Sequence, residues 1–575
     1  MLRRMIMVLV GALTLAAVPV RAQDADEYWT GPLALTPVVT ITIGLAIAPG
    51  DSGALVGTLD SPDQGSFDIP ITDLHKDAER LAFAVPSLGG TYEARWNAAN
   101  QAWDGTWLQS GQSWPLVLKA GERPERTAAS PLPADWQVPS DPAIGAIIDA
   151  RLAGRTGAGI AVGVIEPGGT RIVTRGDGIS ADTLFEIGSI TKIFTALLLA
   201  EAVQRGEVSL DDPVLAHLPP GSAMPGDGGA AITLRQLSQH QSGLPRLPDN
   251  MPYGDPDDPY ADYTEAMMLE FLRAHVLTRA PGAQFEYSNL GVGLLGYVLA
   301  RAAGTDYENL VRTRILTPLG MADSGITLTP AQQARFAPGH DMYMRPTSEW
   351  RLPALAGAGA LRSTAADMLR FLGAVLDPAS PIAADVAITL DGWQPAVRGV
   401  TALGWLGFAP PQGPVMLHSG GTGGYRSAIA AQPATGRAVM VLTNAAAEPS
   451  AEDIALHLIA GTPLAPQAPI PPAPPPVPVR EAMALSPAQL DRVTGTYSLA
   501  PGVTLAVRRE GDGLLAQITG QPGFPIYPSA ALEFFYRVVD ARLRFTEDAG
   551  AVTGGVLLQN GREIPLTRIE QQQGE

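Results

Sequence analysis

Ser189 and Lys192 are the two side chains whose types and spacing most directly suggest chemistry in this chain. Lys192 is one of only three lysines among 575 residues, whereas arginine is used freely. A buried ammonium can lose its proton, whereas a guanidinium effectively cannot. A titratable amine beside a hydroxyl can turn that hydroxyl into a nucleophile. Because Ser-x-x-Lys is a short string that also arises by chance, the pair alone leaves the function open.

A helix would have to bring these two side chains together. The apolar stretch 190–205 reads as a helix that ends at Gly206. This helix would put Ser189 at its N-terminus and Lys192 about one turn later on the same face. The hydroxyl, the amine and the backbone N–H groups of the first helical turn are therefore expected to meet in one place.

The residues around this helix predict a mixed α/β domain from about 140 to 462. Stretches 158–165 and 170–174 read as one β-hairpin. Stretches 427–432 and 438–443 read as a second hairpin. Strands are thus expected at both ends of the domain, with helices and loops between them.

Two β-rich domains are expected on either side of this region. Residues 23–135 and 483–575 alternate apolar and polar residues in short runs broken by Gly, Pro and Asp. Residues 463–482 form a Pro-rich linker that contains Ile470-Pro471-Pro472-Ala473-Pro474-Pro475-Pro476, a stiff polyproline segment.

The N-terminus has the pattern of a secretory signal peptide over residues 1–22. Met1-Leu2-Arg3-Arg4 gives a basic start, an apolar run follows, and Ala22 is a small residue at the expected cleavage point. No later stretch offers about 20 uninterrupted apolar residues, so no integral membrane segment is expected after cleavage. The sequence therefore predicts an exported protein, periplasmic or secreted.

Composition excludes several kinds of function. The chain has no cysteine, which removes disulfides, zinc–thiolate sites and thiol nucleophiles. Its net charge is −18 and Lys and Arg do not cluster, so nucleic acid is not an expected partner. No His-Glu-x-x-His spacing is present, and we expect neither a metal nor a cofactor. The oligomeric state is left open.

Two further short motifs accompany Ser189 and Lys192. Tyr287-Ser288-Asn289 contains Tyr-x-Asn, and His418-Ser419-Gly420 precedes the last predicted strands. In this order the three motifs resemble those of the serine β-lactamase and penicillin-binding-protein-like hydrolases, which include class C β-lactamases, DD-peptidases, D-aminopeptidases and esterases. Class A β-lactamases have Lys-Thr-Gly as the third motif, where this chain has His-Ser-Gly.

Longer stretches carry the same resemblance in the same order over about 300 residues. They are Thr183–Ser189, Ile232–Leu237, His240–Leu244, Pro318–Met321 and Ala358–Thr364. The resemblance implies a multi-domain chain with a central α/β β-lactamase-like domain, in which an antiparallel sheet is flanked by helices and joined by a helical subdomain. The flanking β-rich domains resemble barrel-like accessory domains of secreted hydrolases.

The resemblance also implies roles at the reacting centre. Ser189 would attack a carbonyl, and its proton would go to a nearby base. Lys192 could be that base in its neutral form, or could stay charged and hold Tyr287 as a phenolate; the sequence leaves both open. Asn289 would bind the substrate amide and orient Lys192.

The remaining implied residues would hold the substrate. His418, Ser419 and Gly420 would bind it, and the backbone N–H groups of Ser189 and Gly421 would form an oxyanion hole. Alternatively, His418 could be a buried histidine with only a structural role. Because an imidazole holds a carboxylate less firmly than a permanent ammonium, His418 argues against efficient β-lactam hydrolysis.

A second Tyr-x-Asn string, Tyr307-Glu308-Asn309, lies in a helix-like stretch and is interpreted as structural. The sequence thus predicts a secreted serine hydrolase that forms an acyl-enzyme at Ser189 from a small peptide, amide or ester. A β-lactamase, or a penicillin-binding or ligand-sensing module that turns over slowly, is the alternative.

Overall fold

The computed structural model of this chain describes residues 27–36, 39–50, 55–62, 66–85, 88, 90–109, 112–124, 135–226, 231–252, 255, 257–396, 399–410, 413–449, 451–473, 477–478, 480–500, 503–519, 523–559 and 562–569. The predicted signal peptide, residues 1–22, lies outside these residues. The central unit, Ala129–Ala473, contains every residue of the predicted site.

An eight-stranded antiparallel sheet forms the centre of this unit, with strand order β11-β10-β19-β18-β17-β16-β15-β14. Its strands are β10 (Ile160–Glu166), β11 (Gly169–Arg175), β14 (Gln394–Pro395), β15 (Val400–Thr401), β16 (Leu406–Phe408), β17 (Val415–Gly421), β18 (Arg426–Gln432) and β19 (Arg437–Thr443). Both predicted hairpins are confirmed, since β10 pairs with β11 and β18 pairs with β19.

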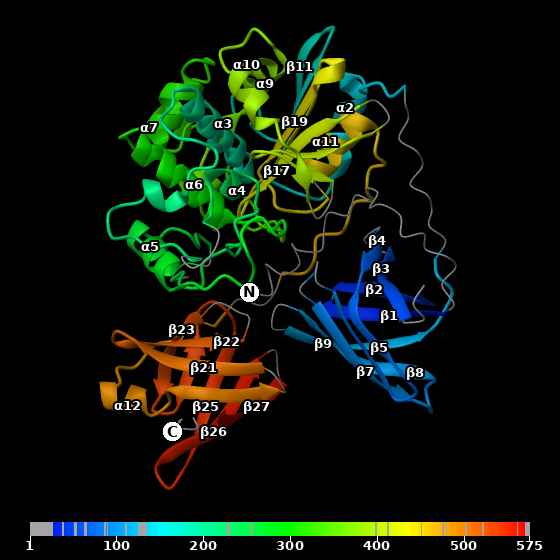
Figure 1. Cartoon of the computed structure of the whole chain (residues 1–575), viewed down its shortest axis with the longest axis vertical. Helices are drawn as coiled ribbons and strands as arrows, with labels where there is room; N and C mark the ends of the chain where they lie inside the picture. The colour runs from blue at the N-terminus through cyan, green and yellow to red at the C-terminus, as the bar shows by residue number, and fades with distance from the viewer. Residues whose placement is uncertain are drawn as a thin grey trace. The chain divides into compact units, whose positions relative to one another are not determined.

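Two helices cover one face of this sheet: α2 (Asp141–Leu152) and α11 (Ala451–Ala460) (Figure 1). Ile148 of α2 and Ile454 of α11 are fully buried in one core cluster with Val162 of β10. Because side chains alternate along a strand, the residue that follows Val162 must point to the opposite face.

The opposite face is covered by α9 (Ala365–Leu376). Gly163 points to this side, where a Cβ atom in its place would lie 2.9 Å from the side chain of Leu369. The sheet is therefore a buried layer between helices, and its strands are apolar on both faces.

The helical part of the unit contains α3 (Thr191–Gln204) and α6 (Asn289–Ala302), with shorter helices around them. These are η5 (Val214–His217), α4 (Leu234–Ser238), α5 (Glu265–Ala274), α7 (Tyr307–Val311), η6 (Arg312–Leu316), α8 (Pro330–Gln333) and α10 (Ala383–Thr389). The predicted helix is confirmed as α3, and it is apolar on nearly every side because other elements surround it. Gly206 follows it with φ +69°, and its N–H donates to the carbonyl of Val203.

The β-rich flanks that the sequence predicts are also confirmed. The N-terminal part is a nine-stranded sheet with the order β4-β3-β2-β1-β9-β8-β7-β6-β5. Its strands are β1 (Glu27–Thr36), β2 (Val39–Pro49), β3 (Leu55–Ser61), β4 (Ser66–Pro70), β5 (Thr72–Lys76), β6 (Arg80–Val85), β7 (Gly90–Asn97), β8 (Ala102–Gln109) and β9 (Gln112–Ala120). The core between these strands includes Tyr92, whose hydroxyl donates to the carbonyls of Trp103 and Leu116.

The C-terminal part is a closed barrel in which β20 pairs with β27. Its strands are β20 (Gly495–Ala500), β21 (Val503–Glu510), β22 (Gly513–Ile518), β23 (Gly523–Ala530), β24 (Glu533–Tyr536), β25 (Ala541–Asp548), β26 (Ala551–Gln559) and β27 (Arg562–Ile569). Buried side chains that include Tyr497, Phe534 and Leu543 pack together in its core. Closure leaves these strands without an unpaired edge.

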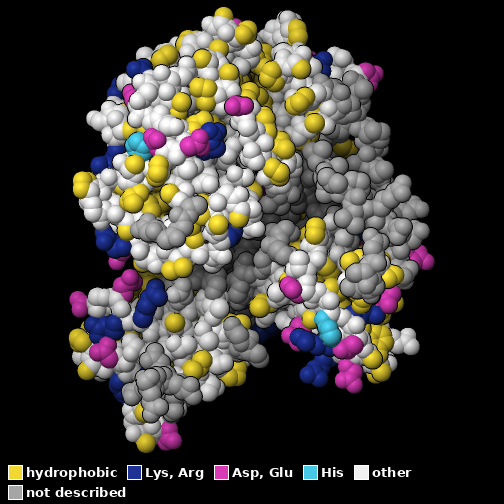
Figure 2. Space-filling view, in the orientation of Figure 1, with side chains coloured by type: hydrophobic (Ala, Val, Ile, Leu, Met, Phe, Trp, Pro, Cys, Tyr) yellow, Lys and Arg dark blue, Asp and Glu magenta, His cyan; other side chains and the backbone are white. Residues whose placement is uncertain are grey.

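Charged side chains are dispersed on the surface. On the face that Figure 2 shows, Lys and Arg of the described residues stand singly or beside Asp and Glu rather than in a stripe. Among the helices that the structure describes, none has the length and apolarity needed to cross a lipid bilayer.

Candidate active site

Ser189 lies in a short 3₁₀ turn, η4 (Gly188–Ile190), that leads directly into α3. Gly188 adopts φ +51°, and a Cβ atom at this position would lie 2.8 Å from the backbone nitrogen of Gly421. The carbonyl of Gly188 accepts a hydrogen bond from the Thr191 hydroxyl at 2.7 Å. Glycine is therefore required where the Ser189 turn and the end of β17 approach each other.

Lys192 is fully buried beside Ser189. Its Nζ lies 3.1 Å from the Ser189 Oγ, 2.9 Å from the Asn289 Oδ1 and 2.6 Å from the carbonyl oxygen of Ala358. Burial, together with the nearby positive charge of Arg246, lowers the pKa of Lys192 well below its usual value. A neutral amine can donate to Asn289 and Ala358 while its lone pair accepts the Ser189 proton.

Tyr287 completes this group. Its phenol makes a hydrogen bond with Ser189, and the Lys192 Nζ lies 5.0 Å from the centre of its ring. Burial raises the pKa of Tyr287 to about 12, against the opposing effects of the Ser189 hydrogen bond and Arg246. At neutral pH the side chain is therefore a phenol that can donate a proton, not a phenolate.

Asn289 is the first residue of α6, and the Ser288 side chain caps this helix by accepting from the backbone N–H of Gly291 at 2.8 Å. The cap fixes Asn289 so that its Oδ1 accepts from Lys192 while its Nδ2 donates to the Tyr260 hydroxyl at 3.1 Å. The amide is thereby held in one orientation at the site.

The second Tyr-x-Asn string lies elsewhere, in α7. The Tyr307 hydroxyl is 2.7 Å from the Thr195 Oγ1, and Asn309 bonds with Asp306 at the helix start. Its interpretation as a structural feature agrees with these contacts.

His418 lies on β17 and is only 3% exposed. Its Nδ1 donates to the carbonyl of Ser419 at 2.7 Å, because a carbonyl can only accept, so Nε2 carries the lone pair. Burial, with a smaller contribution from Lys192, lowers the pKa of His418 to about 3. The imidazole, whose ring centre is 6.2 Å from that of Tyr287, is therefore neutral at physiological pH.

Gly420 and Ser419, which follow His418 on β17, have different surroundings. A Cβ atom at Gly420 would lie 2.1 Å from the carbonyl oxygen of Ile187, so β17 passes too close to the Ser189 turn for any side chain there. The same carbonyl accepts from the Ser427 hydroxyl of β18 at 2.7 Å, which joins the sheet to the turn. Ser419 is half-buried on β17 opposite Ala428.

His240 is a site residue to which the sequence analysis assigned no role. Its ring stacks on Tyr287, and its Nδ1 accepts from the backbone N–H of Ser288 at 3.0 Å. Its own carbonyl accepts from the N–H of Glu286 at 2.7 Å, and its φ of +59° is unusual for a residue other than glycine. His240 thus holds three consecutive residues, 286–288. In the sequence, the stretch His240–Leu244, which carries the family resemblance, could have pointed to His240 as a site residue.

Glu186, three residues before Ser189, is a second unassigned group. It is 4% exposed, and one carboxylate oxygen accepts from the backbone N–H of Trp350 at 2.7 Å. Burial raises the pKa of Glu186 to about 7, against the opposing effects of Thr422, Trp350 and Arg362. A carboxyl group that titrates near neutral pH therefore lies behind the Ser189 turn.

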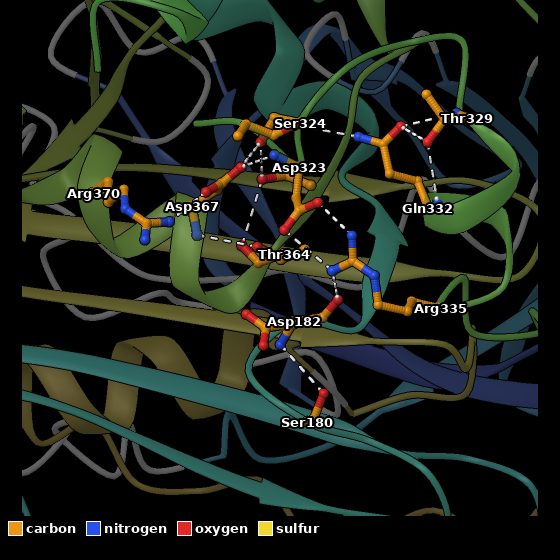
Figure 3. Close-up of polar contacts among 12 residues, drawn as sticks. Ser180, Asp182, Asp323, Ser324, Thr329, Gln332, Arg335, Thr364, Asp367 and Arg370 are labelled. Carbon is orange, nitrogen blue, oxygen red and sulfur yellow. Dashed lines mark hydrogen bonds and ion pairs between the residues drawn. The ribbon is translucent and has the colours of Figure 1, made fainter. Parts of the chain in front are cut away.

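A polar network anchors the strand pair that leads into the site (Figure 3). Strand β12 (Leu184–Glu186) pairs with β13 (Arg362–Thr364), which follows the segment that supplies the Ala358 carbonyl. The carboxylate of Asp367, which is 1% exposed, accepts from the Asp323 N–H, the Ser324 hydroxyl and the Arg370 guanidinium at 2.6–2.9 Å. The backbone N–H of Asp367 donates to the Thr364 hydroxyl, which caps α9, at 3.1 Å. This network holds the β13 end of α9 in place.

Among the described residues, no group of three or more His, Cys, Asp or Glu side chains is arranged to hold a metal ion.

A family model described as Beta-lactamase matches residues 144–462. The chain belongs to the serine β-lactamase and penicillin-binding-protein-like family. The match spans more than half of the chain and contains all the motif residues described above.

Curated relatives agree with this family. The chain is 26% identical over 424 residues to penicillin-binding protein 4* of Bacillus subtilis, covering 68% of this chain and 89% of that protein. It is 32% identical over 269 residues to the D-alanyl-D-alanine-carboxypeptidase/endopeptidase AmpH of Escherichia coli, covering 44% of this chain and 68% of that protein.

A solved relative is the class C β-lactamase from Rhodobacter sphaeroides. It is 27% identical, with a TM-score of 0.48, and the comparison covers 55% of this chain and 97% of that structure.

Proposed function

We propose that this protein is an exported serine hydrolase that forms an acyl-enzyme at Ser189 from peptide, amide or ester substrates. The observation that carries the proposal is the 3.1 Å separation between the Ser189 Oγ and the fully buried Nζ of Lys192. A buried amine with a depressed pKa is a base that can accept the serine proton at a lower pH than an ordinary lysine could.

In the proposed acylation, Lys192 takes the hydroxyl proton while the Ser189 Oγ forms a bond to the substrate carbonyl carbon. The resulting oxyanion would lie against the backbone N–H groups of Ser189 and Gly421, whose segments approach closely. Tyr287, a neutral phenol in contact with Ser189, then donates its proton to the departing amine or alcohol. The proton on Lys192 restores the phenol, and the carbonyl–leaving group bond breaks.

Deacylation would reverse the same proton transfers, with water as the nucleophile. Asn289 would bind the amide of the acyl group, since its side chain is already fixed between Lys192 and Tyr260. His418, Ser419 and Gly420 would line the substrate on the β17 side.

The neutral imidazole of His418 supports peptides and esters over β-lactams as substrates. With a pKa of about 3, His418 supplies a hydrogen-bonding group but no positive charge at the third motif. One relative is named a D-alanyl-D-alanine-carboxypeptidase/endopeptidase, and a peptide substrate fits that name.

Export and domain organisation complete the proposal. Residues 1–22 would be removed as a signal peptide, leaving a β-rich domain at 23–135 and a hydrolase domain at 140–462. A linker at 463–482 would lead to the second β-rich domain at 483–575. N-terminal sequencing of the protein recovered outside the cytosol should begin at Gln23.

The acyl-enzyme is tested by incubating the full chain with a fluorophosphonate or penicillin and analysing the digest by mass spectrometry. We expect the peptide that contains Ser189 to gain the mass of the probe, and Ser189→Ala to gain none. An unmodified peptide, under conditions that label a control enzyme, would instead favour a non-catalytic binding module. Comparing D- and L-aminoacyl amides, short esters and nitrocefin would then identify the substrate class.

A further inference from the structure

Burial disfavours the charged form of three basic side chains in the candidate site. Lys192, His418 and His240 are all buried, and burial lowers the pKa of each. A substrate that carries an anionic group would therefore find no strong partner in these three side chains.

Arg246 places a guanidinium at this site. Its side chain is exposed, and its guanidinium carbon lies 5.1 Å from the centre of the Tyr287 ring. Among the interactions of the described residues, its guanidinium forms no hydrogen bond or ion pair with any acidic side chain. Arg279 and Arg351, which are close in sequence to other site residues, are both paired with carboxylates.

The backbone of Arg246 is fixed to the start of α6. Its carbonyl oxygen accepts from the N–H of Asn289 at 3.0 Å and from that of Leu290 at 3.3 Å. The preceding carbonyl, that of Pro245, accepts from the Ser288 hydroxyl at 2.7 Å. These bonds hold Arg246 beside Asn289, the residue that would bind the acyl part of the substrate.

We propose that Arg246 binds a carboxylate on the acyl side of the scissile bond, so that the preferred substrates are acidic acyl donors. The inference rests on the proposed serine hydrolase function and names its substrate class. A guanidinium offers a planar pair of N–H donors that matches a carboxylate. In a chain with net charge −18, a guanidinium over the ring of Tyr287 would also attract an anionic substrate locally.

The test compares matched substrate pairs in the wild-type chain, Arg246→Gln and Arg246→Lys. p-Nitrophenyl hemisuccinate carries the carboxylate on the acyl group, and p-nitrophenyl butyrate is its neutral counterpart. The quantity compared is the ratio of their kcat/KM values, because any general effect of the substitution on Lys192 or Tyr287 cancels in that ratio.

We expect Arg246→Gln to lower the ratio of kcat/KM for the hemisuccinate to that for the butyrate by roughly 10- to 100-fold, mainly through KM for the hemisuccinate. Arg246→Lys should retain part of the preference for the hemisuccinate. Arg301→Gln is the matched control, since Arg301 is exposed near the far end of α6. Added salt should lower the wild-type ratio and leave that of Arg246→Gln nearly constant. An unchanged ratio in Arg246→Gln would overturn the inference.

A second substrate pair, 4-(butyryloxy)benzoate and phenyl butyrate, places the carboxylate on the leaving group instead. If Arg246→Gln changed only this ratio, the assignment to the acyl side would be wrong. Fluorophosphonate labelling of Ser189 in the same preparations separates the two proposals. Labelled enzyme with unchanged ratios contradicts only the role of Arg246, whereas wild-type enzyme that is neither labelled nor active contradicts the hydrolase function itself.

Discussion

The imidazole of His240 stacks on the phenol ring of Tyr287, with ring centres 4.3 Å apart and planes inclined by 29°. The same imidazole accepts a hydrogen bond from the backbone of Ser288, the residue after Tyr287. One side chain therefore fixes both the ring and the backbone of the proposed proton donor. Its left-handed backbone conformation suggests that this placement is maintained at some conformational cost.

We predict that His240→Asn slows hydrolysis of an alkyl ester by up to about 100-fold, the effect of misplacing a reacting group by about 1 Å. Asparagine tolerates the left-handed conformation and offers an acceptor to Ser288, but it provides no ring for Tyr287 to stack on. The loss should appear in kcat more than in KM.

The control for this prediction is the same substitution in a Tyr287→Phe background. If His240 acts through Tyr287, His240→Asn should cause little further loss once the phenol is absent. Equal losses in both backgrounds would indicate a general structural role instead.

Replacement of Lys192 by arginine tests the proposed base. Arginine stays protonated and so cannot accept the Ser189 proton, and we therefore predict that Lys192→Arg loses at least about 100-fold in kcat/KM. Lys119→Arg is a matched control on the exposed surface of β9 and should be nearly unchanged. Circular dichroism should show that both variants fold, and near-normal turnover in Lys192→Arg would contradict its role.

The elements that carry the site were predictable because their signals are local. Gly206 and the apolar run before it mark the end of α3, and turn residues mark the two hairpins of the central sheet. The Ser189–Lys192 contact follows from helical spacing alone. The remaining predicted residues came from the family resemblance rather than from any local signal.

The supporting contacts could not be predicted in this way. His240 meets Tyr287, and Glu186 meets the backbone of Trp350, only because the tertiary fold brings distant segments together. A histidine or glutamate in the sequence does not reveal its burial, and burial is what displaces the pKa values of both groups. Arg246 likewise gives no sequence signal that its guanidinium lies over the ring of Tyr287.

The two Tyr-x-Asn strings provide a comparison within one chain. Asn289→Ala removes an acceptor from Lys192 and a donor to Tyr260, and we predict a fall in kcat/KM of roughly 10- to 100-fold. Asn309→Ala alters only contacts around α7 and should change kcat/KM by less than about twofold. Similar losses in both variants, measured with one ester, would mean that the first string has no special role.

Glu186 should make stability depend on pH near neutrality. Its folded-state pKa of about 7 lies above the ordinary value of 4.5, so the folded protein holds a proton that the unfolded chain releases between these pH values. Stability is therefore lost as pH rises from 4.5 to 7. We predict that Glu186→Gln removes this loss, which is on the order of 3 kcal/mol.

The measurement is the difference in thermal unfolding between wild type and Glu186→Gln across this pH range. The variant should gain stability relative to wild type as the pH is raised to about 7, and above that pH the difference in stability between the two proteins should stay constant. A difference that does not change with pH would show that Glu186 does not retain its proton in the folded state.

The pH dependence of kcat/KM for a neutral ester distinguishes the two possible bases. If neutral Lys192 is the base, activity should rise through its depressed pKa and then remain level, because protonated Lys192 cannot accept the Ser189 proton. If a Tyr287 phenolate were the base, activity should keep rising toward its pKa of about 12. We predict a plateau that is reached well below the ordinary pKa of lysine, and a profile that still increases toward the pKa of Tyr287 would favour the phenolate. Tyr287→Phe supplies the internal check, since it should lower the plateau while leaving the Lys192 titration in the profile.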